Sequence, residues 1–281
     1  MDIPTNKIVI TNKSSKVFNF KEIAIYKDLL FLFVKRDFIA TYKQTVLGPI
    51  WFVIQPLMST IIFTVIFGNV AGLSTDGTPK ILFYLAGLTC WNYFAECLTK
   101  TSNTFIENKN IFGKVYFPRI IVPLSIIISS ILKFGVQLLL FSATLIIYLI
   151  YEPQSVNPSW LIIIVPFLIA LIGLMGLGFG LIVTSLTTKY RDLKFLLLFG
   201  VQLWMYATPI IYPLSSLNGI LRKVVLLNPM TSIVEIFKNI FLGTGEINIF
   251  LIGYSIGITV VILFLGIFIF NKTERNFMDT V

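Results

Sequence analysis

The chain contains no histidine and unusually little charge. None of its 281 residues is histidine, and 12% are charged, whereas a soluble domain carries about 25%. The absence of histidine excludes His-ligated metal sites, Ser-His-Asp and Cys-His catalytic triads, and histidine proton relays. With 56% hydrophobic residues, the composition predicts a multi-pass membrane protein rather than a cytosolic globule.

The chain also has few cysteines and lacks a phosphate-binding loop. Cys90 and Cys97 lie in an apolar run without metal-ligand spacing, so we expect two small buried side chains. The nearest match to a phosphate loop, residues 72–77, is followed by Thr78 and Pro79 where lysine and a hydroxyl residue are required. We therefore expect no metal or other cofactor on this chain and no ATP hydrolysis by it.

The first seventeen residues are polar and are interrupted by Pro4. They lack the apolar core and the small-residue cleavage site of a signal peptide. We expect residues 1–19 to form a polar cytoplasmic tail, followed by one membrane domain over residues 20–281.

Six stretches are long and apolar enough to cross a bilayer, which requires about 20 residues. The predicted fold is all-α and integral to the membrane, with six transmembrane helices. The predicted spans cover residues 48–70, 81–105, 120–151, 161–184, 195–212 and 249–270.

The distribution of basic residues predicts the orientation of these spans, because lysine and arginine collect in cytoplasmic loops. Counting Lys100, near the end of the second span, seventeen of the 22 fall before the first span, between the second and third, between the fourth and fifth, and after the sixth. Four fall on the opposite side, and Lys133 lies within a span. Both termini are therefore expected in the cytoplasm. The net charge of +9 reflects topology more than nucleic-acid binding.

Two further segments are neither spans nor simple loops. Over residues 20–45, apolar side chains recur every three or four positions between charged ones, which favours an amphipathic helix lying in the membrane interface. The alternative is a cytoplasmic extension of the first span. Over residues 213–246, Asn228-Pro229 is a helix-start signal, followed by an apolar face with Glu235 and Lys238 opposite it. This pattern predicts short external helices that dip back into the membrane, with a plain external loop as the alternative.

Several side chains within the spans are candidates for a function. Glu96 and Lys133 are ionisable residues at similar predicted depths on neighbouring spans, and such residues usually face a partner or a wet cavity. We expect them to pair, with Lys100 one turn from Glu96. The glycines of the fourth span, between residues 173 and 180, favour close helix packing, and a hinge is the alternative.

Aromatic residues are abundant in and around the spans. They suit interfacial belts and packed cores, and their flat faces also suit sugar rings that slide past. Composition does not separate these roles. The candidate pore aromatics are Trp51, Phe52, Phe63, Trp91, Tyr93, Trp204, Tyr206 and Tyr212.

Five short motifs, in order along the chain, together resemble one known family. They are Arg36-Asp37 with residues 42–48, Trp51 and Gln55-Pro56; Asn108-Lys109 through Phe117-Pro118-Arg119; residues 190–193; residues 208–213; and Asn228-Pro229-Met230 with Glu235. In this order the chain resembles the permease subunits of polysaccharide-export ABC transporters, the type-2 ABC exporters that move O-antigen, capsule or teichoic-acid chains.

The resemblance implies a particular set of partners. Two copies of the chain would form a homodimer, and two copies of a separate ATPase subunit would bring ATP and Mg. The substrate would be a polyprenyl-linked glycan, carried across the cytoplasmic (inner) membrane of a bacterium, with no nucleic acid involved.

The resemblance also implies roles for particular segments. Residues 107–119 would form the segment that couples to the ATPase, and residues 213–246 would form an external gate with Asn228, Pro229 and Glu235. Lys35, Arg36 and Lys43 would contact the substrate headgroup, or else anchor the chain at the membrane surface. Thr41 stands where the family often has arginine. The coupling candidates are Asn108, Lys109, Ile111, Phe112, Lys114, Tyr116, Phe117, Pro118 and Arg119.

Two other functions compete with this interpretation. One is a type-2 ABC exporter that carries a drug or a lipid on the same fold. The other is a membrane-embedded transferase that acts on polyprenyl phosphate, but this would need clustered carboxylates or a catalytic histidine. The near absence of acidic residues in the spans favours a path for sugar over a path for ions.

Overall fold

The computed structural model describes residues 20–43, 47–115, 117–190 and 192–276. Throughout these residues the fold is helical, without β-strands, which agrees with the predicted all-α class. Five segments are long and apolar enough to cross a membrane. They are Gly48–Val70, Lys80–Ser102, Ile121–Tyr151, Trp160–Thr187 and Ile249–Glu274.

These spans contain the long helices of the structure. The first is made of a 3-10 turn (η1, Gly48–Ile50), α3 (Trp51–Phe63) and a π-helical stretch (η2, Thr64–Val70). The second and third are α4 (Lys80–Ser102) and α7 (Ile121–Tyr151). The fourth joins η3 (Trp160–Ile164) to α8 (Val165–Thr187), and the last is α12 (Ile249–Asn276).

The predicted fifth span, residues 195–212, forms a shorter element. Here α9 (Leu193–Tyr206) has 14 residues, about 21 Å of helix, whereas the hydrocarbon core is about 30 Å thick. The predicted end of this helix was wrong by six residues. Pro209 explains the early stop, because proline disfavours a helical backbone at the preceding residue. The structure therefore supports five spans by length and does not confirm the count of six.

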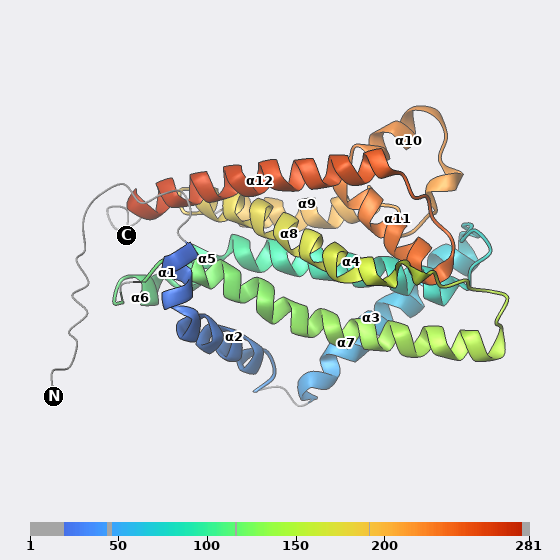
Figure 1. The fold of residues 1–281 in the computed structure, drawn as a ribbon, viewed down its shortest axis with the longest axis horizontal. Helices are drawn as coiled ribbons and strands as arrows, with labels where there is room; N and C mark the ends of the chain where they lie inside the picture. Colours follow the sequence, from blue (N-terminus) through green and yellow to red (C-terminus); the bar gives the residue numbers. More distant parts are fainter. Residues whose placement is uncertain (1–19, 44–46, 116, 191, 277–281) are drawn as a thin grey trace.

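The central helix of the bundle is α4. It packs along α8 on one side and α7 on the other, while α12 lies along the outer side of α8 (Figure 1). Most of α4 is buried, whereas most of α3 and α12 is not. Glycines of α8 make these close contacts possible, with Gly178 facing α12 and Gly173, Gly176 and Gly180 facing α4. A Cβ on Gly176 would lie 2.6 Å from Cβ of Cys97, and one on Gly180 would lie 2.5 Å from Cβ of Thr101.

The short helices gather at the two ends of the bundle (Figure 1). At one end lie α1 (Phe20–Ile25), α5 (Thr104–Glu107), α6 (Lys109–Phe112) and the end of α12. At the other end lie α10 (Gly219–Leu226) and α11 (Pro229–Leu242), after a short turn, η4 (Leu214–Ser216). The candidate coupling and gate segments are therefore at opposite ends.

The segment before the first span is a separate helix, α2 (Lys27–Tyr42), which packs against α7. It ends before Gly48, so it is not a continuous extension of the first span. Phe33 is buried, whereas Phe31 and Leu32 are more than half exposed. This helix therefore has one face on the bundle and an apolar face that the chain itself leaves uncovered.

Asn228 and Pro229 begin α11 as predicted. The Asn228 side chain accepts a hydrogen bond from the backbone N–H of Met230 (3.0 Å), with Pro229 in the first helical turn. The helix ends at Gly243, whose φ of 78° suits glycine. Between these caps α11 contacts α4, α8 and α12.

Candidate functional site

Three groups of side chains stand out, beginning with an ionic cluster within the spans. The ammonium of Lys133 on α7 lies 2.6 Å from Oε1 of Glu96 on α4. The ammonium of Lys100, one turn along α4, lies 2.7 Å from the same oxygen. The structure thus brings Glu96 and Lys133 together. It also adds Lys100 as a second cation on one carboxylate.

The cluster lies where four helices meet. The Lys133 ammonium is 5.2 Å from the centroid of the Phe52 ring on α3, and this ring contacts Phe38 on α2 with centroids 6.2 Å apart. One turn further along, Nδ2 of Asn92 donates to Oε1 of Gln137 at 3.5 Å. The predicted pore residue Phe52 therefore lies beside the ion pair.

The candidate coupling segment is held by α2 and α12. Arg36 on α2 binds its neighbour Asp37 at 2.8 Å and donates from Nη1 to Oδ1 of Asn108 at 3.3 Å. Arg119 donates from Nη1 to the backbone oxygen of Glu274 at 2.8 Å. The candidate coupling segment is thus tied to α2 and to the last described helix, α12.

Of the other residues assigned to coupling, Phe112 and Phe117 point inward. They are 2% and 4% exposed, and their ring centroids are 5.8 Å apart. Both rings are packed within one apolar cluster of the chain, and the role of Phe112 in coupling to a partner stays a prediction. Lys109 and Lys114 are exposed, Ile111 and Pro118 are half-buried, and Tyr116 lies outside the described residues.

The basic candidates on α2 divide into two kinds. Lys35 and Lys43 are exposed and free to meet a headgroup or the membrane surface. Arg36 instead lies over the Phe33 ring, 4.6 Å from its centroid, in addition to its contacts with Asp37 and Asn108. We therefore interpret Arg36 as a residue that links α2 to the candidate coupling segment.

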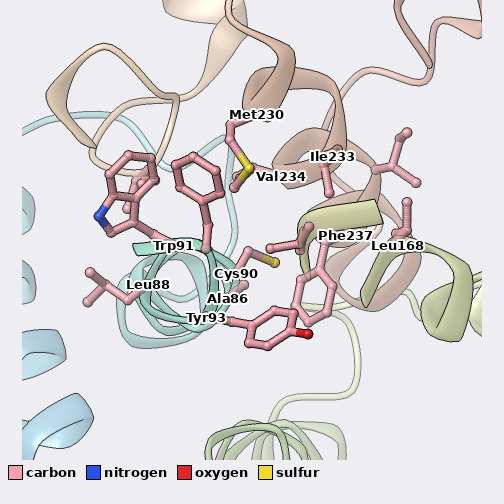
Figure 2. Close-up of a cluster of buried hydrophobic side chains, with 14 of the residues drawn as sticks. Ala86, Leu88, Cys90, Trp91, Tyr93, Leu168, Met230, Ile233, Val234 and Phe237 are labelled. Atoms are coloured by element: carbon pink, nitrogen blue, oxygen red, sulfur yellow. The ribbon is translucent and has the colours of Figure 1, made fainter. Parts of the chain in front are cut away.

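The candidate pore aromatics are not all on the surface. Trp91 and Tyr93 are 3% and 2% exposed, because α4 packs against α7, α8 and α11; their assignment to a pore stays a prediction. Figure 2 shows Trp91 in the packed cluster with Met230, Val234 and Phe237 of α11. Phe63, Trp204 and Tyr212 are half-buried, whereas Trp51 and Tyr206 are exposed.

The third group connects α9 with the predicted gate. The indole N–H of Trp204 donates to Oδ1 of Asn228 at 3.0 Å, and the Asn228 amide donates to Oγ1 of Thr208 at 2.8 Å. The hydroxyl of Tyr212 donates to the backbone oxygen of Tyr206 at 3.0 Å. A predicted pore aromatic and the predicted gate cap are therefore joined directly.

Glu235 and Lys238, expected opposite the apolar face of α11, do not face solvent. They are 3% and 1% exposed, because α11 is surrounded by the bundle. The Lys238 ammonium donates to the backbone oxygen of Pro209 at 2.5 Å and lies 3.9 Å from Oε1 of Glu235. The opposite charges three residues apart in an otherwise apolar helix were the available signal for this buried pair.

Comparison with known proteins agrees with this architecture. The family model for the ABC-2 type transporter matches residues 28–242. The chain belongs to the ABC-2 type transporter family. Two proteins of Klebsiella pneumoniae named O-antigen export system permease protein RfbA are 28% and 27% identical to it, each over 90% of this chain and 94% of the relative. A Myxococcus xanthus protein of the same name is 23% identical over 93% of this chain and 98% of the relative.

Membership of the ABC-2 family establishes several of the predictions. The chain is a membrane transport subunit rather than an enzyme. The family implies an ATPase partner and a membrane setting, and a bacterial inner membrane is supported. The helices of this ABC-2 permease that could span a membrane are consistent with that setting.

Proposed function

We propose that this chain is the permease subunit of an ATP-driven exporter that moves a lipid-linked polysaccharide across the cytoplasmic membrane. The observation that carries the proposal is the match to three permeases named for O-antigen export over about nine-tenths of the chain. A match across the full membrane domain favours a shared transport path as well as a shared fold. In this proposal the cargo is a polyprenyl-linked glycan such as O-antigen, capsule or teichoic acid.

The assembly would contain two copies of this chain and two copies of a separate ATPase. ATP and Mg would bind on the ATPase. The exposed apolar residues of α3 and α9, including Ile61 and Phe199, are consistent with faces that meet lipid or a second copy. In this assembly α9 and the turn that follows it would complete a sixth crossing, and both termini would be cytoplasmic.

Movement would pass from the ATPase to the spans through the coupling segment. Arg36 and Arg119 attach that segment to α2 and α12, so a displacement of the segment would pull on both helices. At the other end, α11 would form the gate. Its cap Asn228 is bonded to Trp204 of α9, which gives α9 a direct connection to the gate.

The direct test is depletion of the chain in its native host. Export of a lipid-linked glycan predicts that polyprenyl-linked glycan accumulates inside the cell while the glycan disappears from the surface. Both quantities can be measured by extraction and by surface labelling. If an ABC exporter of a drug or a lipid were the true function, depletion would leave the glycan pools unchanged.

The ATPase partner is tested separately. Full-length tagged chain purified in mild detergent from the same host should bring down an ABC ATPase, identified by mass spectrometry, at about one copy per permease. Absence of any ATPase from the purified chain, under conditions in which the chain remains folded, would contradict the proposal.

A further inference from the structure

The ionic cluster of Glu96, Lys100 and Lys133 carries more positive than negative charge. Both ammonium groups contact the same oxygen, Oε1 of Glu96. Among the described residues, Asp37 of α2 also attracts Lys100 electrostatically, but its carboxylate is already bound by Arg36 at 2.8 Å. Among the residues that the structure describes, Lys100, Lys133 and Arg36 thus bring three positive charges, and Glu96 and Asp37 bring two negative ones.

The cluster runs from the end of α4 to span depth. Lys100 is about 3 Å and Glu96 about 9 Å along the helix from the end of α4, and Lys133 is about 18 Å from the start of α7. A charge in this region is costly unless it is paired or hydrated, and intramembrane ionisable groups usually mark a substrate path. A structural tie alone would need only one lysine for one glutamate. The second cation therefore calls for a further explanation.

The cluster is accessible from one side. The side chain of Lys100 is 36% exposed and that of Glu96 21%, whereas that of Lys133 is 10% exposed. The centroid of the Phe52 ring of α3 lies 5.2 Å from the Lys133 ammonium. An anion would therefore reach Lys100 first, at the junction of α2, α3 and α4, with Lys133 behind it.

We propose that Lys100 and Lys133 form a binding site for the phosphate headgroup of a lipid, placed within the membrane at the junction of α2, α3, α4 and α7. An ammonium group has three N–H donors, and one contact to Glu96 leaves donors for phosphate oxygens on each lysine. The depth of the site favours a lipid-borne phosphate over a soluble one. Asn92 and Gln137, one turn further along the same two helices, would offer polar contacts to groups attached to that phosphate.

Glu96 sets the strength of this site by competing with the ligand. Its carboxylate neutralises one of the two lysines and orients both, so the site holds an anion weakly enough to release it. This inference rests on the proposed export of a lipid-linked substrate, whose headgroup carries phosphate. It assigns the headgroup to a position deeper than Lys35 and Lys43 on α2.

The test is native mass spectrometry of the full-length chain in detergent, titrated with a polyprenyl pyrophosphate and, separately, with the uncharged polyprenol. We expect the pyrophosphate to bind more tightly. Lys100→Gln should weaken it by about tenfold, the loss of one charged hydrogen bond, and Lys100→Arg should retain it. Lys272→Gln, which removes an exposed positive charge elsewhere, is the matched control and should leave binding unchanged.

Glu96→Gln separates a headgroup site from a purely structural cluster, because it removes the competing carboxylate and keeps the side-chain shape. The headgroup site predicts tighter binding of the pyrophosphate by about tenfold. A structural cluster predicts equal or weaker binding. Should Glu96→Gln fail to fold, the contrast between Lys100→Gln and Lys100→Arg decides alone, and equal binding by those two variants would overturn the proposal.

Inorganic pyrophosphate distinguishes the source of the phosphate. If inorganic pyrophosphate displaces the bound lipid only at a large excess, the result supports a lipid headgroup site. If inorganic pyrophosphate binds as tightly as the lipid, the result overturns the proposal.

Failure of the headgroup site is distinguishable from failure of the proposed function. If depletion of the chain blocks glycan export while substitutions at Lys100 and Glu96 leave binding of the polyprenyl pyrophosphate unchanged, only the headgroup site is wrong. If these variants shift binding but depletion leaves the glycan pools unchanged, only the export function is wrong.

Discussion

The ammonium of Lys238 lies 3.6 Å from the centroid of the Phe83 ring, deep between α11 and α4. The same ammonium donates to the backbone oxygen of Pro209. One charged side chain thus joins the predicted gate helix to α4 and to the turn that ends α9. A cation–π contact is strongest when it is shielded from water, as it is here.

Removal of Lys238 should destabilise the end of the bundle that contains α10 and α11. Lys238→Met keeps much of the volume but leaves Glu235 without its cation and the Pro209 oxygen without its donor, at a cost of about 3 kcal/mol. Thermal unfolding of the detergent-solubilised chain measures this. Lys223→Met, on the exposed surface of α10, is the control and should be nearly neutral. Equal stability of the two variants would show that the buried lysine is not a structural link.

In the Glu96 cluster, we expect the two single alanine substitutions to lower the stability by unequal amounts. Glu96→Ala leaves two ammonium groups unbalanced and should cost about 3 kcal/mol or more. Lys133→Ala leaves Glu96 still bound to Lys100 and should cost less. The double variant should be more stable than the sum of the two losses predicts. Simple additivity, measured by unfolding of all four forms of the chain, would exclude a direct energetic link.

In the candidate coupling segment, we expect one acidic substitution to lower the stability of the chain and another to weaken its contact with the ATPase. Phe112→Asp places a carboxylate in a buried apolar cluster, so it should lower stability by about 3 kcal/mol and reduce insertion. Val115→Asp changes a residue that is 57% exposed and should leave stability unchanged while it weakens copurification of the ATPase. The ratio of ATPase to permease after purification, beside the unfolding temperature, checks both. Normal ATPase recovery with Val115→Asp would exclude this surface from the interface.

Much of the fold could be predicted because long apolar runs and helix-start signals are local features of the sequence. The third span, expected over residues 120–151, is observed as Ile121–Tyr151, and Asn228-Pro229 begins α11. Which side of each helix is covered depends on neighbours distant in sequence. For this reason the burial of Trp91, Phe112 and Lys238 was not predicted.

The Glu96–Lys133 ion pair also shows which features the sequence could predict and which it could not. Glu96 and Lys133 could be matched because two charges at similar depth in an apolar environment have few other partners. The presence of Lys100 on the same oxygen depends on side-chain geometry, so the surplus charge of the cluster emerged only from the structure. The assigned roles in coupling, pore and gate remain predictions.

The glycines of α8 serve close packing, and matched alanine substitutions can separate this from a hinge. In Gly180→Ala the new methyl group would lie 2.5 Å from Cβ of Thr101, and such overpacking should cost about 1–3 kcal/mol. Gly200→Ala on α9 meets no atom within 4 Å and should be neutral or stabilising by about 0.5 kcal/mol. Unfolding of the purified chain compares the two. If α8 instead needs glycine as a hinge, Gly180→Ala would retain full stability and lose transport alone.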